Sequence, residues 1–237
     1  MWVLLPGLLG QASDLDSLIP ESDSIMHIDY IHKIGGDYNG RICALRDVIR
    51  QRASHTDIVG LGYSMGGRLL YSLSQCDPTL FKKSIFISSG FPLSGPKDRY
   101  KKQCFETLAQ NQLSRVTPRE FLHWWYTLPI YSTLKKHQDF DHLITKKTES
   151  FDPIIIKHLL GAFSSLHMPI LSKKINCPSL YFAGEMDKKY QSMKQLLPKY
   201  FENAQFCSVP ESSHLCHWEA SPFLKHTIAK WIHPTRH

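Results

Sequence analysis

The stretch GLGYSMGGR, residues 60–68, surrounds Ser64 with four glycines and places Arg68 directly after them. An apolar run at residues 57–61 precedes the serine, and a helix-like stretch at residues 65–73 follows it. Gly-x-Ser-x-Gly at a strand-to-helix turn is the nucleophile-elbow pattern, in which the glycines allow a tight turn and close packing of the helix on the strand. The stretch therefore predicts a serine hydroxyl that projects from the end of a buried strand.

The rest of the chain alternates short apolar runs with helical patterns. Strands are expected at residues 2–5, 25–30, 57–61, 84–87, 179–183 and 205–209. Helices are expected at residues 40–52, 65–73 and 222–231. Strands that alternate with helices predict an α/β fold with a mostly parallel sheet, covered on both faces and carrying its chemistry at the carboxyl ends of the strands. The length favours a single domain over residues 1–237.

One block, at about residues 94–172, interrupts this alternation because it contains no convincing strand. Within it, Thr117-Pro118-Arg119-Glu120 is a capping box with proline at the first helical position, and it opens a helix through Trp124 and Trp125. Asp152-Pro153 starts another helix, rich in isoleucine and leucine. We expect a helical lid inserted into the sheet.

The composition indicates a globular protein, with 42% hydrophobic and 11% aromatic residues. No apolar run approaches the roughly 18 residues that a membrane-spanning helix needs. The first ten residues, MWVLLPGLLG, have no basic leader and no small-residue cleavage site, so they indicate a strand and its turn rather than a signal peptide. The six cysteines include no Cys-x-x-Cys pair, so no disulfide framework is expected. These features predict a cytoplasmic protein without a membrane partner.

The formal net charge is +7, and the lysines come as isolated pairs along the chain. That dispersal is typical of a solvated surface rather than of a stripe that follows phosphates, so no nucleic-acid partner is expected. A basic field does favour a small polyanionic substrate. Cys216 lies between His214 and His217, but no second cysteine pair or fourth ligand accompanies them, so neither a metal ion nor another cofactor is expected.

A reactive serine needs a histidine that is held by a carboxylate, and at a nucleophile elbow the chain order is serine, acid, histidine. Asp187 lies just beyond the predicted strand at residues 179–183, with Glu185 as the reserve candidate. His214 lies on the loop between the last predicted strand and the last helix, with His217 as its competitor. We predict a catalytic triad of Ser64, Asp187 and His214.

Two backbone amides are expected to stabilise a developing oxyanion. The first is the N–H of Met65, which directly follows the serine. The second is the N–H of Leu8, in the turn Pro6-Gly7-Leu8-Leu9-Gly10 after the first predicted strand.

With these residues in place, the chain resembles the α/β-hydrolase superfamily from end to end. It begins at what would be the third strand of that fold, so the first strands are expected to be absent. Within the superfamily, the segment Gly-Tyr63-Ser64-Met65-Gly-Gly-Arg68 is most similar to the menaquinone-pathway 2-succinyl-6-hydroxy-2,4-cyclohexadiene-1-carboxylate synthases. Three further segments support the resemblance: Trp125-Tyr126 followed by Pro129, Gly184-Glu185-x-Asp187, and Ser213-His214.

The resemblance implies a lyase, in which the serine acts as a base on a ring carbon and pyruvate leaves. The family holds the carboxylates of its small-molecule substrate with arginines, and Arg68 matches one of them. Lysines or an arginine stand where two others are expected: Arg99, Lys101 or Lys102 in the first region, and Lys146 or Lys147 in the second. Tyr63, Trp125 and Tyr126 would line the substrate pocket.

Two other functions remain open for the same scaffold. A carboxylesterase or thioesterase would use Ser64 as a true nucleophile, and the basic surface would suit an acidic carrier protein that presents the ester. A non-catalytic binding protein is the third hypothesis, and the complete set of triad residues argues against it.

Overall fold

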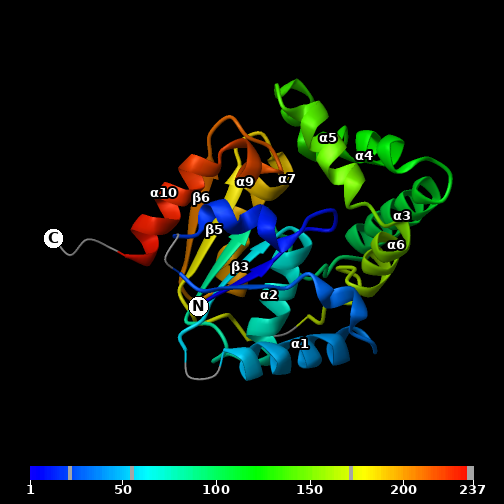
Figure 1. The fold of residues 1–237 in the computed structure, drawn as a ribbon. Helices are drawn as coiled ribbons and strands as arrows, with labels where there is room; N and C mark the ends of the chain where they lie inside the picture. Colours follow the sequence, from blue (N-terminus) through cyan, green and yellow to red (C-terminus); the bar gives the residue numbers. More distant parts are fainter. Residues whose placement is uncertain (21–22, 54–55, 171–172, 234–237) are drawn as a thin grey trace.

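The computed structural model describes residues 1–20, 23–53, 56–170 and 173–233, and a parallel sheet forms its centre (Figure 1). The strands are β1 (Trp2–Leu5), β2 (Ile25–His27), β3 (Val59–Tyr63), β4 (Lys83–Ile87), β5 (Ser179–Gly184) and β6 (Ala204–Val209). Their order across the sheet is β2-β1-β3-β4-β5-β6, and each neighbouring pair is parallel. Each connection therefore has to cross a face of the sheet.

Helices cover both faces of the sheet. Alternate side chains of the strands enter two hydrophobic clusters: Leu4 and Ile85 belong to one, and Val3 and Phe86 belong to the other. The first cluster is closed by η1 (Ala12–Leu18), α9 (Cys216–Glu219) and α10 (Ser221–Ile232). The second is closed by α1 (Tyr38–Arg52), α2 (Met65–Cys76), α7 (Lys188–Gln191) and α8 (Leu197–Tyr200). Burial on both faces explains why the strands read as continuous apolar runs.

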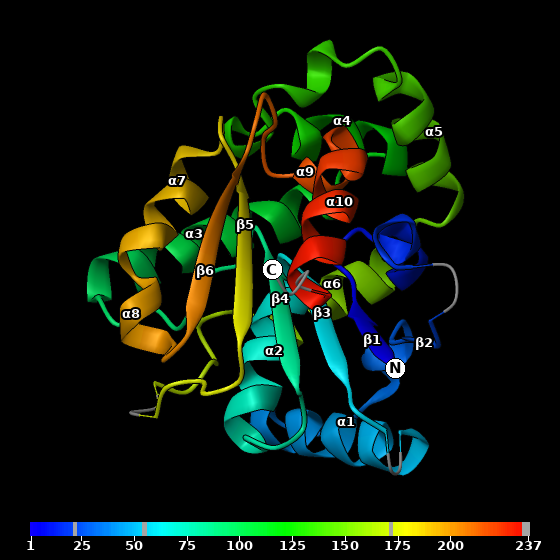
Figure 2. The same cartoon turned by 90° about the vertical axis from the view of Figure 1, so that its left-hand side faces the viewer.

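A helical insertion connects β4 to β5. It contains α3 (Pro96–Leu113), α4 (Pro118–Tyr126), η3 (Pro129–Tyr131), η4 (Leu134–Lys136), α5 (Phe140–Glu149) and α6 (Pro153–Ala162). In Figure 2, α4 and α5 lie beyond one end of the sheet. The predicted capping box opens α4, since Thr117 Oγ1 accepts from the Glu120 amide and the Glu120 carboxylate accepts from the Thr117 amide. Ser172, the expected end of the insertion, lies outside the described residues.

The predicted parallel sheet covered on both faces is confirmed, with shifted boundaries. β3 begins at Val59 rather than at residue 57 and ends at Tyr63, so Ser64 follows the strand directly. β2 ends at His27, because the chain turns into the short helix η2 (Tyr30–Lys33). Another short helix, η5 (Ser192–Gln195), joins α7 to α8. Within the described ranges, no helix combines the length and the apolar character needed to cross a bilayer.

Candidate active site

Ser64 forms the turn between β3 and α2 in a backbone conformation that residues other than glycine rarely adopt. Its φ is 50° and its ψ is −104°. The Ser64 amide donates to the Ile87 carbonyl at the end of β4, over 2.9 Å. A Cβ on Gly66 would lie 1.9 Å from the Leu5 carbonyl oxygen. The close approach of α2 to β1 therefore requires glycine at this position. The backbone thus fixes Ser64 at the carboxyl end of the sheet.

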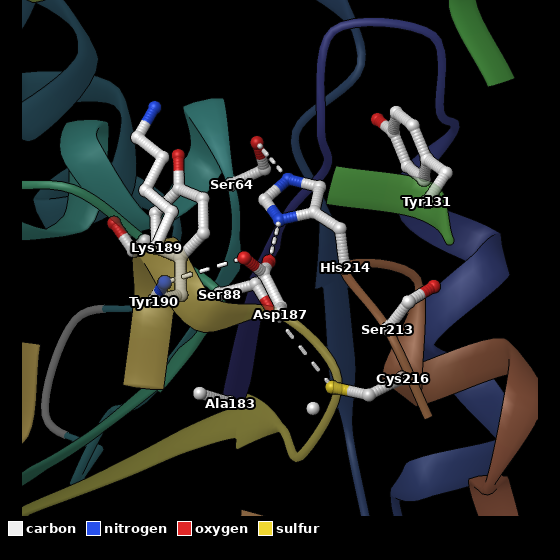
Figure 3. A network of polar contacts seen from close by, with 12 residues as sticks. Ser64, Ser88, Tyr131, Ala183, Asp187, Lys189, Tyr190, Ser213, His214 and Cys216 are labelled. Atoms are coloured by element: carbon white, nitrogen blue, oxygen red, sulfur yellow. Dashed lines mark hydrogen bonds and ion pairs between the residues drawn. The ribbon is translucent and has the colours of Figure 1, made fainter. Parts of the chain in front are cut away.

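The structure brings Ser64, His214 and Asp187 into one chain of contacts (Figure 3). His214 Nε2 lies 3.1 Å from Ser64 Oγ, and His214 Nδ1 lies 2.8 Å from Asp187 Oδ2. Glu185, the reserve acid, is exposed, and its carboxylate accepts from the Glu211 amide instead. The arrangement has the geometry of a serine, a base and an orienting carboxylate.

Both partners of the serine are held rigidly. Asp187 is 1% exposed and caps α7, with its Oδ1 accepting from the Tyr190 amide over 3.3 Å. His214 is also 1% exposed, and its amide donates to the Ile130 carbonyl in the helical insertion, over 2.9 Å. The imidazole packs between the rings of Tyr131 and Tyr190, with centroids 5.3 and 4.7 Å away. The insertion therefore helps to position the histidine.

The surroundings of His214 keep its imidazole neutral near pH 7. Burial lowers its pKa below the ordinary 6.5, and the charges of Lys189 and Arg68 act in the same direction. The Asp187 carboxylate opposes them and raises the pKa, but it does not outweigh the burial. A neutral imidazole with Asp187 at Nδ1 can accept the Ser64 proton at Nε2.

The two predicted oxyanion donors flank the serine. Met65 is the first residue of α2, so its N–H has no acceptor within the helix. In the described part of the chain, the amides of Met65 and Leu8 donate no hydrogen bond, and Leu8 lines the same cavity as Ser64. Both N–H groups thus lack an acceptor among the described residues, and their role as oxyanion donors stays a prediction.

Ser64 opens into a cavity of about 310 Å³ between the sheet and the insertion. Five of the residues that the sequence singled out as candidates for substrate binding line it: Tyr63, Trp125, Tyr126, Lys146 and Lys147. The wall also contains Asp14, Tyr131, His142, His217 and Trp218, together with the loop at residues 6–11. The Trp125 indole N–H donates to the Tyr131 hydroxyl over 3.0 Å, which fixes two of the aromatic rings.

Comparisons with known proteins agree on the architecture. No family model matches the sequence. A Bacillus subtilis (strain 168) protein with the provisional name 2-succinyl-6-hydroxy-2,4-cyclohexadiene-1-carboxylate synthase is 23% identical over 246 residues, which cover 97% of this chain and 89% of the relative. MenH from S. aureus matches with a TM-score of 0.80 at 18% identity, covering 98% of this chain and 92% of that one.

A third protein, an esterase from Exiguobacterium antarcticum, matches with a TM-score of 0.77 at 14% identity, over 98% of this chain and 91% of its own. This chain has the α/β-hydrolase fold. The predicted resemblance to the α/β-hydrolase superfamily is thereby confirmed at the level of the fold. The insertion between β4 and β5 of this α/β-hydrolase fold supplies the roof of the cavity.

Two of the predicted substrate-binding residues do not line the cavity of this α/β-hydrolase fold. Arg68 lies one helical turn beyond Ser64, but its Nη2 donates to the Phe163 carbonyl over 3.3 Å, just after α6. Its Nε is buried without a partner among the described residues. Lys102 forms an ion pair with Glu106 at 2.9 Å, and burial lowers its pKa to about 8. Neither cation therefore lines this cavity, and their role in substrate binding stays a prediction.

Sequence reasoning missed the contributions of Asp14, Tyr131 and His217 to the cavity wall. His217 does not replace His214 in the triad, but it faces the cavity three residues later. Asp14 comes from η1, which no sequence pattern predicted. Within the described residues, no three His, Cys, Asp or Glu side chains gather as a metal site. The Cys216 sulfur instead lies 3.8 Å from the Ser88 hydroxyl (Figure 3).

Proposed function

We propose that this α/β-hydrolase-fold enzyme is a lyase that releases pyruvate from a cyclohexene substrate bearing carboxylates. The observation that carries the proposal is the Ser64–His214–Asp187 contact chain at the wall of a cavity roofed by Trp125 and Tyr126. The names of the Bacillus subtilis relative and of the S. aureus MenH structure support this reaction over others available to the fold. The low identity to both makes the substrate a matter for experiment.

In the proposed reaction, Ser64 Oγ removes a proton from a ring carbon while its own proton passes to His214 Nε2. The electron pair left on the carbon shifts through the ring double bond, so a cyclohexadiene forms as the bond between the ring and the pyruvate oxygen breaks. The leaving enolate then takes up the proton held on His214 Nε2 and becomes pyruvate. In this proposal, the amides of Leu8 and Met65 stabilise the negative charge that develops during the transfer.

Lys146 is the cation that we assign to direct binding of a substrate carboxylate, since it lines the cavity and has no ion-pair partner in the described ranges. Lysine binds a carboxylate as a point charge and not through a bidentate fork. Arg68 contributes its charge from beyond the wall, where it also lowers the pKa of His214. The proposed partner is thus a small carboxylate substrate rather than a macromolecule.

A second candidate is a carboxylesterase or thioesterase, in which Ser64 attacks an ester carbonyl and forms an acyl-enzyme. The placement of Arg68 and Lys102 favours it, because a cavity that lacks both cations is less suited to a substrate with several carboxylates. An ester carried by an acidic protein would approach through the basic surface.

One experiment separates the two reactions. The purified protein is offered the cyclohexene precursor that carries the pyruvate group and, separately, short p-nitrophenyl esters, with Ser64→Ala as the control. The lyase proposal expects pyruvate release that Ser64→Ala abolishes. Rapid ester turnover with an acyl burst and no pyruvate would overturn the lyase proposal in favour of the esterase.

A further inference from the structure

The cavity contains a buried ion pair that the proposed reaction does not use. Lys147 is 8% exposed, and its Nζ lies 2.5 Å from Asp14 Oδ2. The Gln11 amide donates to the same carboxylate oxygen over 2.9 Å. Burial alone would raise the pKa of Asp14, but Lys147 and the Gln11 amide together lower it, so the carboxylate is ionised and cancels the lysine charge. This side of the cavity therefore presents no net charge.

His217 completes the same side. It is 4% exposed, it lines the cavity, and its Nδ1 is buried without a hydrogen-bond partner among the described residues. Its ring packs against Tyr63 with centroids 4.1 Å apart. Burial lowers the pKa of His217 to about 3, so the ring is neutral at pH 7 and offers one donor and one acceptor. Nδ1 is closed off from the cavity, whereas Nε2 is accessible and has no hydrogen-bond partner among the described residues, so Nε2 is the nitrogen that can contact a ligand.

We propose that Asp14, Lys147 and His217 form a specificity wall that binds an uncharged polar group of the ligand, such as a hydroxyl, and disfavours a carboxylate at this position of the cavity. His217 makes the direct contact, and Asp14 sets the charge by neutralising Lys147. Lys146 remains available to bind a ligand carboxylate. The preferred ligand therefore carries a carboxylate at one end and a hydroxyl at the other. This inference rests on the proposed function only in taking the cavity at Ser64 as the ligand site.

Three rigid benzoates that differ in one substituent test the specificity wall by calorimetry, without any turnover. They are 4-methylbenzoate, 4-(hydroxymethyl)benzoate and terephthalate, which place a methyl, a hydroxyl or a second carboxylate opposite a common carboxylate. We expect the wild-type protein to bind 4-(hydroxymethyl)benzoate about fivefold more tightly than either of the others, the effect of one net hydrogen bond.

Substitutions assign the preference to its residues. Asp14→Asn removes the carboxylate that neutralises Lys147. The affinity for terephthalate should then rise about tenfold relative to that for 4-(hydroxymethyl)benzoate, because the second carboxylate can form an ion pair with a largely desolvated lysine. Adding Lys147→Met to that variant should remove the gain. His217→Phe should abolish the preference for hydroxymethyl over methyl, whereas His217→Gln should keep part of it. Asp16→Asn is the matched control on η1, because Asp16 contacts His27 and does not line the cavity.

The proposal is overturned if the wild-type protein binds terephthalate most tightly or if none of the three probes binds. It is also overturned if Asp14→Asn, in a folded protein, leaves the ratio of the affinities for terephthalate and 4-(hydroxymethyl)benzoate unchanged. Circular dichroism and thermal unfolding of each variant establish that it is folded. Failure of the lyase reaction would appear in the pyruvate assay alone, since binding of these benzoates needs no chemistry at Ser64. The two proposals therefore fail independently.

Discussion

Ser64 carries its function in a strained backbone. A residue other than glycine at φ 50° and ψ −104° costs on the order of 1–3 kcal/mol. The Ile87 carbonyl and the close approach of α2 to β1 hold the residue there. The strained backbone conformation is therefore part of the geometry that points the Ser64 hydroxyl at His214.

This strain predicts that Ser64→Gly is more stable than Ser64→Ala by about 1 kcal/mol, since glycine adopts positive φ without a Cβ penalty. Both variants lack the hydroxyl, so the comparison isolates the backbone. Equilibrium unfolding in urea measures the difference. Equal stability of the two variants would show that the turn is not strained.

The packing of α2 on β1 is the contact between elements that fixes the elbow. A Cβ on Gly66 would lie 1.9 Å from the Leu5 carbonyl oxygen, and the backbone atoms there cannot move aside independently. Gly161, near the end of α6, is a matched control, because a Cβ added to it would meet no described atom within 4 Å.

We expect Gly66→Ala to lower the free energy of unfolding by more than about 3 kcal/mol, because the added methyl group forces α2 away from β1. Gly161→Ala should instead raise it by about 0.5–1 kcal/mol, the gain of alanine over glycine in a helix. Equilibrium unfolding in guanidinium measures the free energy of unfolding of both variants. A loss below about 1 kcal/mol for Gly66→Ala would contradict the close packing.

Elements with local signals could be predicted from the sequence, and contacts made by long side chains could not. The strand–Ser64–helix turn and the order of Asp187 and His214 follow from short-range patterns. The direction of the Arg68 side chain depends on Phe163, 95 residues away, and the pairing of Lys147 with Asp14 spans 133 residues. Such pairings depend on how the insertion docks on the sheet, which periodicity does not encode.

At the scale of the whole molecule, the insertion and the sheet share the active site. The Ile130 carbonyl accepts from the His214 amide, and Lys147 joins α5 to Asp14 on η1. Two neutral histidines, His214 and His217, are buried between them. Their burial couples the stability of the whole fold to pH.

The free energy of unfolding should fall as the pH is lowered from about 6.5 towards 3. The pKa of His217 is about 3 in the folded protein and about 6.5 in the unfolded chain, so only the unfolded chain binds the proton in this range. The slope from this residue is at most about 1.4 kcal/mol per pH unit. His217→Gln should reduce the slope, as measured by urea unfolding at a series of pH values. An unchanged slope would mean that His217 is protonated in the folded state.

The central claim is that His214 and Asp187 activate the Ser64 hydroxyl, and covalent labelling by a fluorophosphonate tests it most directly. The reagent phosphonylates an activated serine, and mass spectrometry of the intact and digested protein locates and times the modification. We predict that the wild-type protein is labelled at Ser64 alone, that Ser64→Ala is not labelled, and that His214→Asn reacts at least about 100-fold more slowly, the contribution of a positioned general base. Labelling of the wild-type protein at the rate of His214→Asn, or at a residue other than Ser64, would contradict the account.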